Sequence, residues 1–247
     1  MDDNPEGHCQ DTSEVKTYKF SLPLVSVIIV NYNYGRFLKQ AADSVFEQTY
    51  PNVECIIVDN ASTDGTLERL AAYPRARVIH HAGNEGWGAS VRDGIAASDR
   101  ASIVLIDADL EYPPEAIPRL LEALQHSPVV YCSRFRGSRP PAMPLLRRLG
   151  NGIMSAFYNL LFRQRVTDFA TGMKGLRRGA VPLERLRRNG FEHGAEIAAL
   201  IALCGQRIEE ITVEYSPRQR GRSKMRHLRE AAKVLVYLLA YRLRGTI

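Results

Sequence analysis

Two carboxylates separated by one residue follow an apolar run near the middle of the chain, in the segment Ile106-Asp107-Ala108-Asp109. Carboxylates at the end of a strand can converge on a hard divalent cation, Mg²⁺ or Mn²⁺, and leave coordination positions open for phosphate oxygens. The cation would then neutralise a diphosphate leaving group. Because a solvated acidic turn gives the same short pattern, the pair needs support from other segments.

A second polar segment, Val58-Asp59-Asn60, ends the apolar run nearer the N-terminus. Asp59 and Asn60 offer a carboxylate and an amide, which suit the donors and acceptors of a nucleotide base or ribose. The residues that follow, Ser62 to Asp64, are better explained as a helix cap.

A glycine-bearing turn, Asn84-Glu85-Gly86-Trp87-Gly88, comes directly before a helix-like stretch. Its glycines would permit close approach of the backbone, and amides at a helix start suit a phosphate or a ribose. An ordinary turn explains this short pattern equally well.

A basic segment lies near the C-terminus, where Arg218, Arg220, Arg222 and Lys224 surround Gly221. A clamp of this kind suits two anionic partners, such as a donor diphosphate and an acceptor phosphate. A phosphate acceptor is already ionised near neutral pH and needs no general base, whereas a hydroxyl acceptor needs one. The candidate bases are Asp168, Glu192 and Glu196. A solvated surface is the alternative explanation of the arginines.

The elements that must position these residues alternate along the first half of the chain. Apolar runs at 25–30, 53–58, 77–81, 103–106 and 129–132 are separated by helix-like stretches at 36–48, 64–72, 87–97 and 114–125. This alternation predicts an α/β fold with a mainly parallel sheet and helices on both faces. Such sheets bind ligands beyond the carboxyl ends of their strands, where the polar segments lie.

The strand rhythm breaks at about residue 134. We expect a helix at 145–162, a glycine-punctuated stretch at 168–179, a helix at 192–204, a short strand at 207–215 and a closing helix at 225–243. The apolar residues of the helices at 145–162 and 225–243 are flanked by arginines. Both patterns fit either contact with a membrane interface or coverage of the protein's own core.

The charge divides sharply between the two halves of the 247 residues. Residues 1–133 hold 10 Lys and Arg against 19 Asp and Glu, a net of −9, and residues 134–247 hold 23 against 8, a net of +15. The basic half suits phosphates, acidic lipid headgroups or nucleic acid. Nucleic acid is disfavoured, because no recognised module is present and aromatic residues do not interleave the basic run.

Targeting signals are not evident. Residues 1–22 are polar, and the longest apolar run near the C-terminus, Val234 to Ala240, falls far short of the roughly 20 residues of a spanning helix. We therefore expect a cytoplasmic protein, either soluble or peripherally attached to the cytoplasmic face of a membrane.

Taken in order, these segments resemble glycosyltransferase family 2 over about residues 24–225. The run Val25–Asn33 resembles that family's opening strand and base loop, Asp59-Asn60 falls at its base- and ribose-binding pair, and Asp107-x-Asp109 matches its metal motif. The resemblance implies a GT-A fold and a metal-dependent, inverting transfer of a sugar from a nucleotide-sugar donor.

Within the family, the chain is most similar to dolichol-phosphate mannose synthases and bacterial polyprenyl-phosphate sugar transferases. Three segments carry this similarity: Asp107–Glu115, where Glu111 stands in place of a glutamine that can ligate the metal; Asp168–Lys174, similar to a sugar-site segment; and Arg218–Lys224, similar to an Arg-x-x-Gly-x-Ser-Lys loop. They predict transfer to a polyprenyl phosphate. The chain departs from this group at two places: Asn60 stands in place of an aspartate, and the opening strand ends with Asn31-Tyr32-Asn33-Tyr34. Transfer to a saccharide or another hydroxyl acceptor therefore remains an alternative.

The resemblance also implies a role for each candidate residue. Predicted metal ligands are Asp107, Asp109 and Glu111; predicted donor contacts are Tyr32, Asn33, Asp59, Asn60, Asn84, Gly86, Asp107, Ala108 and Lys224; predicted catalytic residues are Asp107, Asp109, Asp168, Arg218 and Ser223; and predicted acceptor contacts are Arg134, Thr171, Glu196, Arg218, Arg220 and Ser223.

The expected organisation is a single catalytic domain with short extensions. Residues 1–22 form an N-terminal tail, 23–225 the GT-A domain, and 226–247 a C-terminal amphipathic helix. The domain divides into a nucleotide and metal half, 23–133, and an acceptor half, 134–225. A nucleotide-sugar-binding module without catalysis is a further alternative, disfavoured by the intact Asp107 and Asp109 pair.

Overall fold

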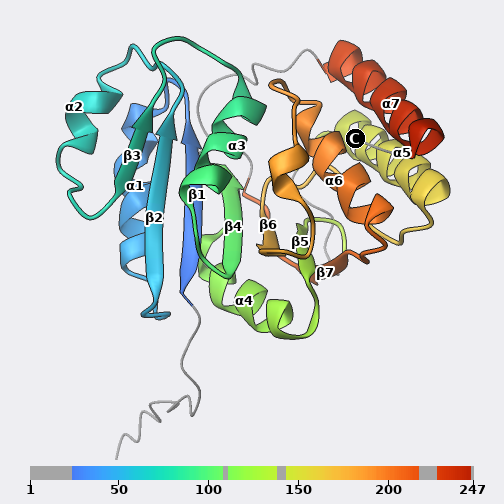
Figure 1. Cartoon of the computed structure of the whole chain (residues 1–247), viewed down its shortest axis with the longest axis horizontal. Coiled ribbons are helices and arrows are strands. Elements are labelled where there is room, and N and C mark those ends of the chain that lie inside the picture. The colour runs from blue at the N-terminus through green and yellow to red at the C-terminus, as the bar shows by residue number, and fades with distance from the viewer. Residues whose placement is uncertain (1–23, 108–110, 138–142, 217–226, 246–247) are drawn as a thin grey trace, which may run out of the picture.

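A computed structural model describes residues 24–107, 111–137, 143–216 and 227–245. A seven-stranded sheet forms the centre of the molecule, in the order β3-β2-β1-β4-β6-β5-β7 (Figure 1). Its strands are β1 Val25–Asn31, β2 Val53–Asp59, β3 Arg77–His80, β4 Ser102–Asp107, β5 Val129–Ser133, β6 Lys174–Arg177 and β7 Glu209–Thr212. All neighbours are parallel except the two pairs that involve β6. The prediction of a mainly parallel sheet is confirmed.

Helices cover both faces of the sheet. They are α1 Gly35–Phe46, α2 Thr66–Leu70, α3 Trp87–Ala97, α4 Ile117–His126, α5 Leu145–Phe162, α6 His193–Leu203 and α7 His227–Arg244, with short 3-10 turns η1 Pro114–Ala116 and η2 Leu183–Arg185. Side chains alternate along each strand, so one face of β1 packs on α1, in a buried cluster that also includes α4, while the other packs on α3, in a cluster that also includes α6. Burial on both faces explains the nearly uninterrupted apolar run of β1.

Strand β6 was not predicted. It lies antiparallel between β4 and β5, and it falls within the stretch that we expected to be only glycine-punctuated. Helix α4 packs directly on Gly175, where a Cβ would lie 2.8 Å from a methyl carbon of Leu124. Lys, Gly and Arg make a poor strand sequence, and the two neighbouring strands determine its conformation instead.

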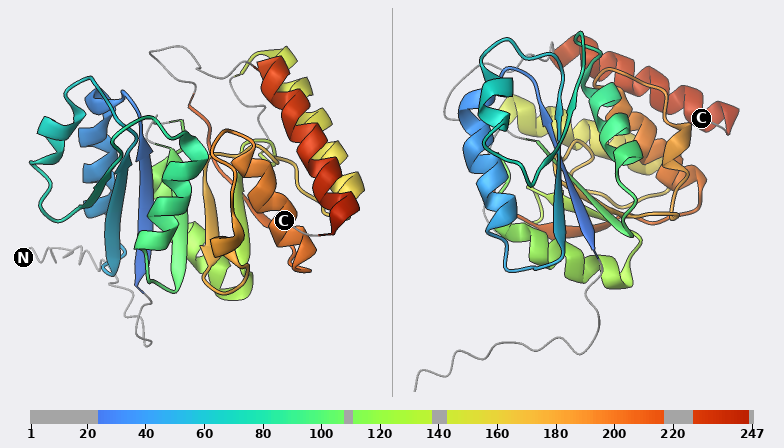
Figure 2. Two further views of the ribbon diagram at one scale, coloured as in Figure 1. Left: turned by 45° about the horizontal axis from the view of Figure 1, so that its top comes forward. Right: turned by 60° about the vertical axis from the view of Figure 1, so that its left-hand side comes forward.

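Helices α5 and α7 form an outer layer beyond α6 (Figure 2). The inner sides of the three helices share a buried cluster that includes Tyr158, Ala198, Leu238 and Tyr241. The C-terminal helix therefore covers the protein's own core with one side. Within the described ranges, no helix is long and apolar enough to cross a membrane.

Candidate functional site at the carboxyl edge of the sheet

The ends of β1, β2 and β4 bring the predicted polar residues to one edge. In the sheet register, Asn31 of β1 lies opposite Asp59 of β2, and Val30 lies opposite Asp107 of β4. The connections lead from β1 to β2 and β3 on one side and to β4 on the other, so the strand order changes direction between β1 and β4. Parallel sheets bind ligands beyond such a point.

Asp59 is a buried anchor for the loops around it. Its Oδ1 accepts a hydrogen bond from Asn31 Nδ2 at 2.9 Å, and its Oδ2 accepts one from the Ser62 N–H at 3.1 Å and lies 2.9 Å from His80 Nδ1. Burial raises the pKa of the Asp59 carboxyl, but hydrogen bonds from Ser62, Asn31 and His80 outweigh burial and lower it overall. The Asp59 side chain has no exposed surface, so its carboxylate orients the loops after β1 and β2 from inside the protein.

Tyr32 and Asn33 lie in the loop that follows β1. Asn33 adopts φ 56°, and its Oδ1 accepts a hydrogen bond from the Thr63 N–H at 2.7 Å. The Asn33 N–H in turn donates to Ser62 Oγ at 2.8 Å. The loops after β1 and β2 are therefore tied together, and Tyr32 and Asn33 remain half-exposed above them.

Asn60 and Asn84 meet in a directed network of hydrogen bonds. Asn60 Oδ1 accepts from the Glu85 N–H at 2.8 Å and lies 3.0 Å from His81 Nδ1, and Asn60 Nδ2 donates to Asn84 Oδ1 at 3.1 Å. Because the Glu85 N–H fixes the orientation of the amide, His81 Nδ1 is the donor to Asn60. The side-chain amide of Asn60 then has one N–H left for a further partner, and that partner would have to be a hydrogen-bond acceptor.

The glycines at the start of α3 serve packing. A Cβ on Gly86 would lie 2.3 Å from the Asn189 carbonyl oxygen, and one on Gly88 would lie 2.3 Å from the Arg188 carbonyl oxygen. Both amides are also used within the protein, since Gly86 donates to Asn84 Oδ1 and Gly88 to the Asn189 carbonyl. The structure therefore supports the explanation of this segment as an ordinary turn. The contact of Gly86 with the nucleotide-sugar donor is still a prediction.

Asp107 is half-exposed at the end of β4, among three residues that the sequence did not single out. Trp87 Nε1 donates to Asp107 Oδ1 at 3.1 Å. A Cβ on Gly172 would lie 2.7 Å from Asp107 Oδ2, so the backbone approaches where only glycine fits. Lys174 is buried nearby, and burial lowers the pKa of its ammonium to about 8 while Asp107 and Asp168 act to raise it.

Two of these three could have been suspected from the sequence. Trp87 is the only tryptophan of the chain and stands in the glycine-bearing turn, and Lys174 closes the segment that resembles a sugar site. No local pattern connects either residue with Asp107, because they are 20 and 67 positions away along the chain.

A divalent cation fits the chemistry of this edge. Asp107 supplies a hard carboxylate oxygen at a strand end. Glu111 follows four residues later, and its Oε2 accepts a hydrogen bond from the Tyr215 hydroxyl at 3.4 Å. Asp109 and Ala108 fall outside the described residues. In the described part of the chain, one other group, His81, Glu85 and Asp93, has ligand atoms within 4.8 Å of one another. In that group, His81 is hydrogen-bonded to Asn60 and to Asp93.

Asp168 forms a buried ion pair with Arg134. Its Oδ2 accepts hydrogen bonds from Arg134 Nε at 2.7 Å and from the Arg134 N–H at 3.1 Å, and its Oδ1 accepts from Nη2 at 2.8 Å. The carboxylate has no exposed surface, and the guanidinium lies over the rings of Tyr112 and Tyr215. A bidentate pair of this kind fixes the segments after β5 and before β6 relative to each other.

Thr171 and Glu196 are also engaged inside the protein. Thr171 Oγ1 donates to the Cys132 carbonyl at 2.6 Å, and the Glu196 carboxylate accepts from the N–H groups of Arg187 and Arg188 at 2.9 to 3.0 Å. Burial raises the pKa of Glu196, but hydrogen bonds from His193 and these two amides outweigh it and lower the pKa. Both residues are almost completely buried, so the structure places neither on an open surface. Arg218, Arg220, Ser223 and Lys224 fall outside the described residues.

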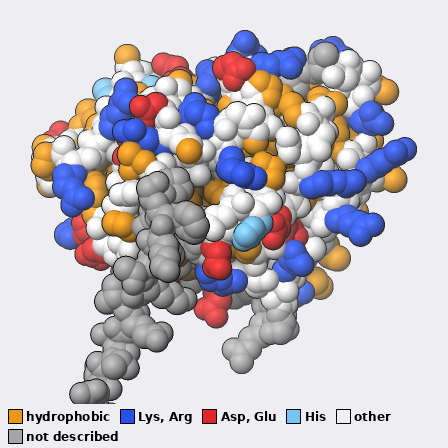
Figure 3. Space-filling view, turned by 60° about the horizontal axis from the view of Figure 1, so that its bottom comes forward, with side chains coloured by type: hydrophobic (Ala, Val, Ile, Leu, Met, Phe, Trp, Pro, Cys, Tyr) orange, Lys and Arg blue, Asp and Glu red, His pale blue; other side chains and the backbone are white. Residues whose placement is uncertain are grey.

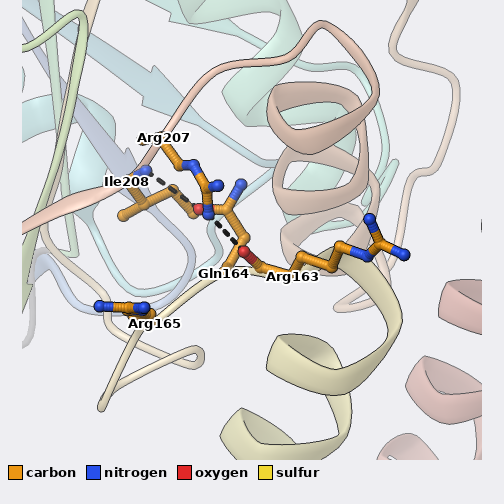
Figure 4. A pocket seen from close by; sticks show the side chains of 5 residues that line it. All are labelled: Arg163, Gln164, Arg165, Arg207 and Ile208. Atoms are coloured by element: carbon orange, nitrogen blue, oxygen red, sulfur yellow. Dashed lines mark hydrogen bonds between the residues drawn. The ribbon is translucent and has the colours of Figure 1, made fainter.

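A further cavity lies at the opposite edge of the sheet. It has a volume of about 670 Å³ and is lined by Arg163, Gln164, Arg165, Arg207 and Ile208. Arg207 and Ile208 precede β7, whose direction matches that of β1, so the cavity is at the amino edge. Figure 4 shows that the side chains of Arg163 and Arg165 point apart, while Gln164 bonds to the Ile208 N–H at 3.3 Å. The arrangement joins two loops and does not form a convergent anion site.

Comparison with known families agrees with this geometry. The model of the family described as "Glycosyl transferase family 2" matches residues 26–182. An undecaprenyl-phosphate mannosyltransferase of Micrococcus luteus is 29% identical over 186 residues, which are 71% of this chain and 76% of that protein. A dolichol-phosphate mannosyltransferase of Pyrococcus furiosus is 30% identical over 211 residues, 82% of this chain and 59% of that protein.

Coverage of the relatives varies. An uncharacterised glycosyltransferase of Nostoc sp. is 37% identical over 111 residues, but these are only 43% of this chain and 34% of the relative. Among solved structures, glucosyl-3-phosphoglycerate synthase from Mycobacterium tuberculosis, in complex with Mn²⁺, uridine diphosphate and glucosyl-3-phosphoglycerate, has a TM-score of 0.63 at 20% identity and covers 90% of this chain and 80% of its own. That similarity shows a shared fold.

Proposed function

The chain belongs to glycosyl transferase family 2, and on that premise we propose that it transfers a sugar from a nucleotide-sugar donor to a polyprenyl phosphate. One observation carries the choice of acceptor. Two of the three carboxylates considered as general bases, Asp168 and Glu196, are buried, and each accepts several hydrogen bonds from protein groups. A phosphate acceptor is already ionised and needs no base.

The reaction is then a single displacement at the sugar carbon C1. An oxygen of the acceptor phosphate forms a bond to C1 as the bond from C1 to the donor diphosphate breaks, and the nucleoside diphosphate leaves with the bonding electrons. The configuration at C1 inverts. Asp107, Asp109 and Glu111 would hold a Mg²⁺ or Mn²⁺ ion, which would supply positive charge against the diphosphate.

The chain's own residues divide the remaining work. Tyr32, Asn33, Asn60 and Asn84 contact the base and ribose, with Asp59 orienting their loops from below. Trp87 holds Asp107 at the strand end, and the buried Lys174 ammonium supplies positive charge nearby. The segment from Arg218 to Lys224 binds the phosphates of donor and acceptor, as its spacing predicts.

The names of two relatives support a lipid-phosphate acceptor, because they are described as undecaprenyl-phosphate and dolichol-phosphate mannosyltransferases. A protein with such an acceptor works at a membrane, which we propose as its peripheral location. The second candidate function is transfer to a saccharide or other hydroxyl. Glu192 favours it, because this third candidate base is half-exposed at the start of α6.

The test is transfer by the purified chain from a panel of nucleotide sugars, with Mg²⁺ or Mn²⁺, to a short polyprenyl phosphate or to a saccharide. We expect a lipid-linked sugar phosphate as the product detected by mass spectrometry. Arg218→Lys should lower acceptor use more than donor hydrolysis, because lysine binds phosphate only as a point charge. Product formed only on the saccharide, and abolished by Glu192→Gln, would establish the second candidate instead.

A further inference from the structure

The outward side of α5 carries five large apolar side chains in water. Leu145, Leu146, Leu149, Ile153 and Leu160 are between 55% and 82% exposed. Their spacing along the helix places them on one face, while Tyr158 and Ser155 point into the protein. Single exposed leucines are ordinary on soluble proteins, but a contiguous row of five is a mark of an interaction surface.

Helix α7 extends this apolar surface. Val236, Leu239 and Leu243 are 44% to 77% exposed and recur at intervals of three and four residues, whereas Leu238 and Tyr241 face the buried cluster shared with α5. Of the eleven exposed large hydrophobic residues among those described, eight lie on these two helices. We call the eight side chains together the α5/α7 face.

The charges beside the α5/α7 face are almost all positive. Helix α5 contains Arg147 and Arg148 and no acidic residue. Helix α7 ends with exposed Arg242 and Arg244, and its one acidic residue, Glu230, pairs with Lys233 at 3.0 Å. Figure 3, which brings the lower end of Figure 1 forward, shows Lys and Arg side chains interspersed with hydrophobic ones on that end of the molecule.

We propose that the α5/α7 face docks on an anionic lipid bilayer, with its apolar side chains in the interface and its arginines against the headgroups. The charge selects this occupant, since a two-fold dimer through the same face would oppose arginine to arginine. Because neither helix can cross a bilayer, both lie on its surface. Figure 1 shows α7 beginning at the end of the sheet where β1 and β2 terminate, so docking brings the candidate site toward the lipid.

The biological reason for membrane docking rests on the proposed function, but the docking itself does not. Vesicle flotation of the full chain tests the docking without donor or acceptor substrate. We expect binding to vesicles of phosphatidylcholine with roughly a third phosphatidylglycerol, weakening as salt rises. The double variant Leu146→Ser with Leu149→Ser should bind at least about tenfold more weakly, because two side chains no longer enter the interface. The control is Leu67→Ser with Val78→Ser, two residues that are each 39% exposed on α2 and β3, and its binding should equal that of the wild type.

The charge has its own test. Arg242→Gln and Arg244→Gln should each lower binding to the anionic vesicles roughly fivefold, the equivalent of about 1 kcal/mol for a cation near such a surface. Arg69→Gln on α2, at the far end of the sheet, should leave binding unchanged. With phosphatidylcholine alone, the arginine variants should no longer differ from the wild type.

Analytical ultracentrifugation identifies the competing occupant. A wild-type dimer that Leu146→Glu converts to a monomer would overturn the proposal and assign the face to a second copy, as would a wild type that fails to float with anionic vesicles. Transfer to a short acceptor dispersed in detergent separates the two proposals. Binding to vesicles without sugar transfer would contradict the proposed function and leave the docking surface standing. Sugar transfer without binding to vesicles would contradict the docking surface and leave the proposed function standing.

Discussion

The part of the structure up to β4 and the part that follows β5 use their polar residues in opposite ways. At the ends of β1, β2 and β4, polar side chains hold loops while Tyr32, Asn33 and Asp107 stay half-exposed. In the part that follows β5, Asp168 and Glu196 have at most 1% of their surface exposed. Their carboxylates accept hydrogen bonds from other groups of the protein. A carboxylate near a site is thus not by itself a base. What it contacts decides whether it can accept a proton from a substrate.

The largest expected effect is on the buried pair in the part that follows β5. Asp168→Asn should lower the free energy of unfolding by about 3–5 kcal/mol, because it leaves the Arg134 guanidinium buried without its counter-charge. Molecules that remain folded should still transfer sugar to a phosphate acceptor. Denaturant unfolding and turnover at low temperature measure both quantities.

The double variant Asp168→Asn with Arg134→Gln is the control for that prediction. It should recover part of the lost stability, since no charge is then left unpaired. Unchanged stability of Asp168→Asn together with a collapse of turnover would instead make Asp168 a general base.

The next effect is on Asp107, in the half-exposed site. Asp107→Asn should lower turnover at least about 10²-fold, the scale for loss of a major electrostatic stabiliser. Folding should be retained, because Trp87 can donate to an asparagine oxygen as it does to the aspartate. The matched control is Asp99→Asn at the amino end of β4, which should keep full turnover. Full wild-type activity in excess chelator would contradict metal-dependent catalysis.

A smaller effect should follow from the network around Asn60. His81→Leu removes one of the two donors to Asn60 Oδ1 and leaves the amide held less firmly, by Glu85 and Asn84 alone, so discrimination between nucleotide donors should fall roughly fivefold, about one hydrogen bond. His81→Asn retains a donor near the position of Nδ1 and should restore most of the discrimination. Competition between nucleotides at a fixed concentration of donor measures this discrimination. An unchanged order and strength of nucleotide binding in His81→Leu would exclude Asn60 from the base site.

The smallest effect concerns acid stability. The pKa values of Asp59 and Glu196 are lowered in the folded protein, so the native state binds fewer protons than the unfolded chain. Their contribution to stability is therefore fully present above the ordinary carboxyl pKa, about 4, and is lost as the pH falls through the lowered values. Unfolding free energies from pH 7 to pH 3 should show this loss, and Asp59→Asn should reduce its slope.

The sequence by itself determined the family, the parallel strands β1, β2 and β4, and the placement of Asp59, Asn60 and Asp107 at the strand ends. Apolar runs and the residues that end them are local features, and a parallel sheet brings its carboxyl ends to one edge whatever the details of packing. The helix predicted at 145–162 has the observed bounds for the same reason, because an amphipathic repeat over 18 residues is also local.

Only the tertiary structure decided the rest. Strand β6 exists because β4 and β5 offer it hydrogen bonds on both sides, which its own Lys-Gly-Leu-Arg sequence does not indicate. The partners Trp87 and Asp107, or Arg134 and Asp168, lie 20 and 34 positions apart, and no periodicity connects them. The burial of Glu196 depends on a loop packed over α6, and the two sides of α7 are distinguished only by α5 and α6 covering one of them. Each of these outcomes depends on which segments meet in space, whereas a local pattern reports only how a segment would prefer to fold.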